Sequence, residues 1–202
     1  GTVGGPKNNI IPDGLLEKNG IELIKNEVVS VDRSQKTVTL KDGEVIRYEK
    51  LIFATGSVPA VPPIPGIDKK MVFTVRKDFN YLEGMLGELK SVKDLVIIGG
   101  GFIGVEFADE CRKDHEMNIT IVEALSHCLQ MAMDDEYCQE AESKLAETGV
   151  KIVKGSQVKS IQGDDMVTGV KLADGTEIKA DMVILAIGAK PNTELAKQAG
   201  LA

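Results

Sequence analysis

Residues 99–104 read Gly-Gly-Gly-Phe-Ile-Gly, a spacing that suits a turn holding phosphate groups. Gly99 permits a tight turn from a strand into a helix, and Gly101 presents no Cβ to a ligand near the backbone. Gly104 lets the helix pack closely on the preceding strand. The first N–H groups of that helix lack partners within it and lie at the positive end of its dipole. The pattern therefore predicts a site for a pyrophosphate.

The glycine pattern alone is a weak signal of a dinucleotide site, and the neighbouring elements strengthen it. An expected strand, Leu95–Ile98, precedes it, an expected helix, Phe102–Lys113, follows, and the next strand, Ile119–Val122, ends at Glu123. An acid there can accept hydrogen bonds from the ribose hydroxyls of a dinucleotide. A 2′-phosphate would meet this carboxylate, with no Arg or Lys in residues 124–133 to compensate. We therefore expect NAD(H) rather than NADP(H). The alternative is a glycine turn that only packs a helix, with the acid solvated.

The elements that position these residues have the pattern of an α/β protein. From about residue 71, short apolar strands alternate with helices, and Asp134 begins a helix that Gly149 closes. Residues 158–179 read as three short strands with a hairpin turn, and Met182–Ala186 reads as a buried strand. This pattern predicts a Rossmann-like domain with a parallel sheet and a β-meander.

The first third of the chain is predicted to be rich in strands. Its apolar or alternating runs are Ile21–Leu23, Glu27–Val31, Thr37–Leu40 and Val45–Tyr48. The segment from Val58 to Gly66 carries four prolines and is expected to be an extended connector.

Composition excludes several classes of function. The net charge of −7 argues against nucleic acid, which requires a dense basic face. No stretch approaches the roughly 20 apolar residues of a membrane span, and residues 1–6 show no secretory signal. Three cysteines without metal-ligand spacing favour a reducing compartment, most simply the cytoplasm. We interpret Cys111 as packing, and His115 and His127 as too isolated for a metal site.

Three segments together resemble the FAD-dependent pyridine nucleotide-disulfide oxidoreductase family, and in particular its NADH oxidase and coenzyme A-disulfide reductase branch. The first is Leu51–Ser57, with Ile64-Pro65-Gly66 after it, which is similar to the "ATG" link between flavin and NAD domains. The second is Gly99–Glu106, and the third is Ala186–Asn192, where the family's chain leaves the NAD domain.

The resemblance implies roles for individual residues. Phe102 corresponds to a gate over the flavin, or alternatively packs on the sheet, and Glu106 corresponds to an acid near the nicotinamide, or alternatively is a surface charge. Gly188 would line the nicotinamide end with its backbone. The expected NAD(H) contacts are Gly99, Gly100, Gly101, Phe102, Ile103, Gly104, Glu106, Glu123 and Gly188, and the expected contacts on the flavin side are Ala54, Thr55 and Gly56.

The resemblance also implies a division of the chain and a function. Residues 1–70 are expected to be part of a flavin domain, and residues 71–202 an NAD(H)-binding domain. The family's flavin fingerprint, redox cysteine and second flavin motif are expected outside this chain. The chain is thus expected to be an inactive portion of an oxidoreductase that passes hydride from NADH to FAD. The longer enzyme is expected to be a homodimer.

Two other functions stay open at this point. One is a non-catalytic NAD-binding module for redox sensing or assembly. The other is a dehydrogenase acting directly on a substrate, which would need a proton-transfer residue in a substrate domain.

Overall fold

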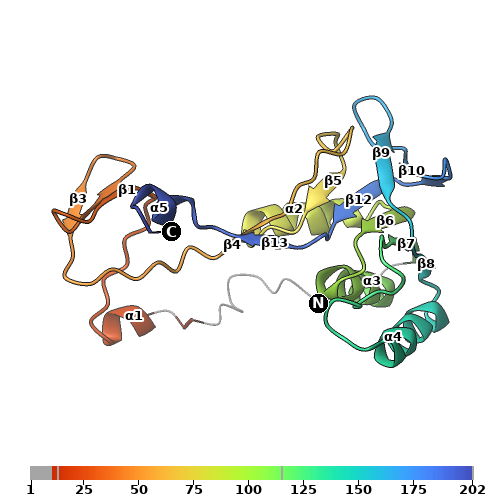
Figure 1. Ribbon diagram of the computed structural model, residues 1–202, viewed down its shortest axis with the longest axis horizontal. Coiled ribbons are helices and arrows are strands. Elements are labelled where there is room, and N and C mark those ends of the chain that lie inside the picture. Colours follow the sequence, from red (N-terminus) through yellow and green to blue (C-terminus); the bar gives the residue numbers. More distant parts are fainter. Residues whose placement is uncertain (1–10, 13, 115, 202) are drawn as a thin grey trace. The chain divides into compact units, whose positions relative to one another are not determined.

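The computed structural model describes residues 11–12, 14–114 and 116–201, which form two compact units (Figure 1). One unit is Pro59–Lys190, and the other joins Thr2–Val58 to Pro191–Ala202. The predicted boundary at residue 70 falls inside the first unit, because Ile64 and Ile67 pack against its core. The assignment of residues 1–70 to a flavin domain stays a prediction.

A five-stranded parallel sheet forms the centre of the unit 59–190, in the order β5-β12-β6-β7-β8. These strands are β5 (Val72–Thr74), β6 (Asp94–Ile98), β7 (Asn118–Val122), β8 (Lys151–Val153) and β12 (Met182–Leu185). Strands β6 and β12 are almost wholly buried and, apart from Asp94, consist of Val, Ile, Leu and Met, as expected for a parallel sheet covered on both faces.

Side chains of the sheet alternate between two layers. Leu95 and Ile97 pack on the face covered by α2 (Phe79–Leu89), α3 (Phe102–Asp114) and α4 (Asp135–Glu147). Val96 and Ile98 pack on the opposite face, against an antiparallel sheet. That sheet is β9 (Val158–Gln162), β10 (Gly169–Leu172) and β11 (Glu177–Lys179), in the order β11-β10-β9. The predicted parallel sheet and β-meander are thus confirmed.

The second unit contains an antiparallel sheet and two short helices. Strands β1 (Val28–Asp32), β2 (Thr37–Leu40) and β3 (Val45–Arg47) pair in sequence order, with α1 (Leu15–Lys18) before them. Helix α5 (Glu194–Gln198) comes from the other end of the chain and packs near β1. Arg33 Nη1 donates hydrogen bonds to the carbonyl oxygens of Ala199 and Gly200, at 3.4 and 3.2 Å.

Several short elements differ from the sequence prediction. The predicted strand Ile21–Leu23 is wrong, because this exposed run pairs with no other strand. The prediction also missed α1, β4 (Ser57–Pro59), β5 and β13 (Ala189–Pro191). Strands β4 and β13 each contain a proline and pair with each other from distant parts of the chain. Such pairing depends on tertiary structure and leaves little local signal.

Candidate functional site

The glycine turn connects β6 to α3 and depends on its first glycine. Gly99 has φ +105°, in the left-handed region that glycine adopts readily. A Cβ on Gly99 would also lie 2.6 Å from the carbonyl oxygen of Ala186, at the end of the neighbouring β12. Both facts require glycine at this position.

The other glycines of the turn have different surroundings. A Cβ on Gly104 would collide with the backbone oxygen of Gly99, so this glycine allows close packing of α3. A Cβ on Gly100 would lie 2.5 Å from Cys128 Sγ. A Cβ on Gly101 would meet no atom within 4 Å. Gly101 is therefore the position where the turn is open to a ligand.

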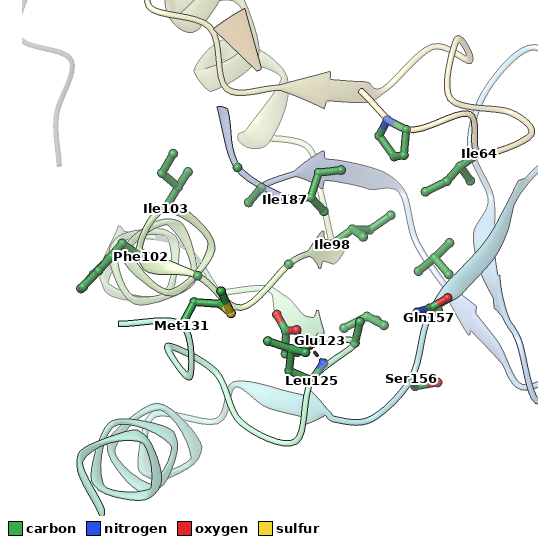
Figure 2. Close-up of a pocket in the computed structure, with 18 residues that line it drawn as sticks. Ile64, Ile98, Phe102, Ile103, Glu123, Leu125, Met131, Ser156, Gln157 and Ile187 are labelled. Carbon is green, nitrogen blue, oxygen red and sulfur yellow. Dashed lines mark hydrogen bonds between the residues drawn. The ribbon is translucent and has the colours of Figure 1, made fainter. Parts of the chain in front are cut away.

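The Glu123 carboxylate lies beside the turn and is held by backbone amides. Glu123 follows β7, and its residue is 9% exposed. Oε2 accepts a hydrogen bond of 2.6 Å from the Gly100 N–H. Oε1 accepts one of 2.7 Å from the Leu125 N–H (Figure 2). Each carboxylate oxygen can accept more than one hydrogen bond, so the group can also bind hydroxyls.

A cavity of about 720 Å³ opens at the carboxyl ends of β6, β7 and β12 (Figure 2). Ligands of open α/β sheets bind at this edge. Six of the nine predicted NAD(H) contacts line the cavity: Gly99, Gly101, Phe102, Ile103, Glu123 and Gly188. Gly100 and Gly104 are buried behind the cavity and shape the turn.

Glu106 lies elsewhere. It is exposed one turn after Phe102 and lines a shallow hollow between α3 and α4. The structure brings Phe102 to both the cavity and this hollow, with 58% of the residue exposed.

Sequence reasoning missed part of the cavity wall. The missed side chains include Leu125, Met131, Ser156, Gln157 and Ile187. Most of them follow strands of the parallel sheet, so a search after each strand end could have found Leu125, Ser156 and Ile187. Met131 comes from a loop whose path the sequence does not reveal.

A lysine lies beside the loop that follows Glu123. Lys154 follows β8, and its Nζ lies 2.7 Å from Glu142 Oε2 and 3.4 Å from His127 Nδ1. The stretch 124–133 lacks Arg and Lys, but the residue after β8 supplies a lysine, and Glu142 neutralises it.

The expected flavin-side residues do not line this cavity. They lie in the other unit, where Thr55 Oγ1 donates a 2.5 Å hydrogen bond to the Asn192 carbonyl oxygen. The Asn192 N–H donates one of 2.9 Å to the Gly56 carbonyl oxygen. The structure therefore joins the first and third segments of the resemblance, and Ala54 is exposed beside them.

The three cysteines are buried, and the pKa values of two of them are raised. Cys111, Cys128 and Cys138 are thiols and form no disulfide within the described residues. Burial, together with the nearby Glu142 and Glu123, raises the pKa of Cys128 to about 12. Burial likewise raises the pKa of Cys138. A thiolate nucleophile is thus disfavoured at both positions.

Metal ligands and membrane segments were sought in the described residues. Within them, no group of three His, Cys, Asp or Glu side chains could hold a metal ion. His115 lies outside them. In the same part of the chain, no helix has the length and apolar character needed to cross a membrane.

The amino-acid sequence is similar to those of several known oxidoreductases. A family model described as pyridine nucleotide-disulphide oxidoreductase matches residues 6–202. The NAD(P)H nitrite reductase of Bacillus subtilis is 36% identical over 186 residues, which are 92% of this chain and 23% of that protein. The CoA-dependent NAD(P)H sulfur oxidoreductase of Pyrococcus abyssi is 38% identical over 194 residues, which are 94% of this chain and 43% of that protein.

Solved structures show the same architecture. The water-forming NADH oxidase of Lactobacillus brevis, bound to NADH, matches with a TM-score of 0.82 at 28% identity, over 90% of this chain and 41% of that chain. An engineered NADPH-bound form of that oxidase matches equally well, and its substitutions include aspartate to alanine and, at the next residue, alanine to arginine. The chain spans less than half the length of each of these relatives.

Proposed function

The chain belongs to the pyridine nucleotide-disulphide oxidoreductase family, and from this membership we propose that it is the NAD(H)-binding portion of a flavin-dependent oxidoreductase. In that enzyme a hydride passes from NADH to FAD. One observation carries the proposal: the open Gly101 and the backbone-held carboxylate of Glu123 lie at the wall of one cavity.

The residues of the cavity fit a dinucleotide. The pyrophosphate would lie over Gly101, where the first N–H groups of α3 can donate to it. The ribose hydroxyls next to the adenine would donate to Glu123. The nicotinamide would extend toward Phe102 and Gly188, at the other side of the cavity.

The cofactors supply the redox chemistry, with NADH as hydride donor and FAD as acceptor. This chain's residues bind and orient the donor. Phe102, largely exposed, is proposed to cover the nicotinamide end until the ligand displaces it, and Gly188 presents backbone there. On the resemblance alone, Glu106 is proposed to lie near the nicotinamide, and the segment Ala54-Thr55-Gly56 is proposed to contact the flavin.

Other properties of the longer enzyme rest on the same resemblance. We propose a homodimer in the cytoplasm, with an electron acceptor that residues outside this chain select. The hydrogen bonds between Thr55-Gly56 and Asn192 support this enzyme role over that of a free-standing NAD sensor, which would not need either segment.

We predict that the chain binds NADH at least tenfold more tightly than NADPH. A 2′-phosphate would meet the Glu123 carboxylate, and about 1.4 kcal/mol of such repulsion already gives a factor of ten. The order of residues, an acid and then Ala124, matches the residue types that were changed in the engineered NADPH-binding relative.

Fluorescence or calorimetric titration with both nucleotides tests this preference. Glu123→Gln keeps an acceptor for the Gly100 amide and removes the charge. It should therefore reduce the difference between the affinities for NADH and NADPH. Equal affinities for NADH and NADPH in the unsubstituted chain would contradict the prediction.

A further inference from the structure

Glu142 is a buried carboxylate that the cavity itself does not use. It lies on α4, and its residue is 8% exposed, whereas Glu140 and Glu147 on the same helix are exposed. Lys154 Nζ lies 2.7 Å and His127 Nδ1 3.3 Å from Glu142 Oε2. A buried charge is costly even when paired, and an apolar side chain of similar size would often be as stable. Stability alone therefore does not account for Glu142.

The other oxygen of Glu142 reaches the segment that supports the glycine turn. Oε1 accepts a 2.8 Å hydrogen bond from the Cys128 N–H. The next residue, Leu129, donates its N–H to the Gly100 carbonyl oxygen at 2.8 Å. Cys128 Sγ also occupies the space that a Cβ on Gly100 would need.

Gly100 completes the connection to Glu123. Its carbonyl oxygen accepts from Leu129, while its N–H donates to Glu123 Oε2 at 2.6 Å. One peptide segment thus links the carboxylate on α4 to both parts of the proposed NADH site. Leu129 has φ +63°, which a branched side chain rarely adopts, so this segment needs fixed contacts to keep its shape.

We propose that Glu142 is a positioning residue for the dinucleotide, acting through the Cys128-Leu129 backbone on Gly100 and Glu123. The inference rests on the proposed function, because it assumes that the glycine turn and Glu123 bind NADH. Lys154 and His127 keep the carboxylate in place, and hydrogen bonds from Lys154 and the Cys128 N–H outweigh burial and hold the pKa of Glu142 below its usual range. The group is therefore charged at neutral pH and acts only as an acceptor.

Glu142→Met tests the proposal, because methionine fills a similar space but cannot accept from Cys128. We expect about tenfold weaker NADH binding, as for the loss of a buried charge-assisted hydrogen bond. We also expect faster hydrogen exchange of the Leu129 amide without nucleotide. Lys154→Met leaves the Cys128 contact intact, so it should weaken binding less.

Asp94→Asn is the matched control. Asp94 also pairs with a lysine, Lys179, at 2.7 Å, and accepts from Asn118, but it lies at the start of β6, the opposite end from the turn. This variant should lower the melting temperature while leaving NADH affinity and Leu129 exchange unchanged.

The outcomes separate the two proposals. If the unsubstituted chain does not bind NADH, the proposed function fails and this inference fails with it. If it binds, and Glu142→Met binds equally well with unchanged Leu129 exchange, only the positioning role is overturned. Should Glu142→Met not fold, the double variant Glu142→Met with Lys154→Met removes the acceptor together with the cation that it would leave unpaired. An unchanged affinity and unchanged Leu129 exchange in that variant would overturn the role as well.

Discussion

At the scale of single residues, each glycine of the turn has a different structural role. Gly99 provides the backbone angle, Gly104 provides close packing, and Gly101 leaves open space. The sequence pattern predicts all three roles, because they follow from the missing Cβ. It does not predict that Gly100 faces Cys128 Sγ, since the 126–133 loop reaches the turn only in the folded chain.

We predict opposite effects of alanine at two of these positions. Gly101→Ala should weaken NADH binding at least about tenfold, because its methyl group would displace the phosphate from amide donors that contribute roughly 1.5–3 kcal/mol each. Its stability should be unchanged or slightly higher, since φ at Gly101 is not left-handed and a Cβ meets nothing. Gly104→Ala should instead lower stability by about 1–3 kcal/mol through crowding against Gly99.

Thermal melts and NADH titrations of both variants check this contrast. Unaltered NADH affinity in Gly101→Ala would mean that the pyrophosphate does not lie over this turn.

At the scale of elements, β6, α3 and β7 follow from the sequence with nearly their observed bounds. Long buried runs and a glycine turn give strong local signals, and they place Glu123 at the carboxyl edge of the sheet. The sequence cannot separate Glu142 from Glu140 or Glu147, because only the docking of α4 against the 126–133 loop and Lys154 buries one of them. For the same reason, the ion pair that Lys154 forms with Glu142 could not be predicted from the sequence.

The ion pair between Glu142 on α4 and Lys154 should make the free energy of unfolding depend on pH. The pKa of Glu142 is lower in the folded chain than its ordinary value of 4.5, so the unfolded chain takes up this proton first as pH falls. The stabilisation is therefore present above pH 4.5 and is lost as pH falls through the lower folded-state pKa.

Denaturant unfolding of Glu142→Gln and the unsubstituted chain measures this effect. The variant should be less stable near pH 7. The difference in free energy of unfolding between the two proteins should shrink between about pH 5 and pH 3. Glu147→Gln, on the exposed side of the same helix, is the control and should show no such convergence. A gap that stays constant with pH would contradict the prediction.

At the scale of the whole molecule, bound NADH should stabilise one of the two units directly and not the other. The whole cavity wall, from Pro62 to Gly188, belongs to the unit 59–190. We predict that NADH at about 100 times its Kd stabilises this unit by roughly 2.7 kcal/mol, which corresponds to a melting shift on the order of 10 °C.

Hydrogen exchange with and without NADH tests this prediction. Protection should rise at β6 and β7 and stay unchanged at β1 and β2. Gly101→Ala at the same nucleotide concentration provides the control. Equal protection of both sheets would contradict a site confined to the first unit.

The hydrogen bonds between Thr55 and Asn192 also bear on the order in which the chain folds during synthesis. They join residues 137 positions apart, and Arg33 reaches Ala199 and Gly200 across a still longer separation. The unit 59–190 is continuous in sequence and can form its sheet once it has left the ribosome. The other unit must wait until the intervening segment has been translated, roughly ten seconds at ordinary rates of protein synthesis. During that interval its strands β1–β3 lack α5, so the nascent chain exposes them to chaperones until the whole unit 59–190 has been translated.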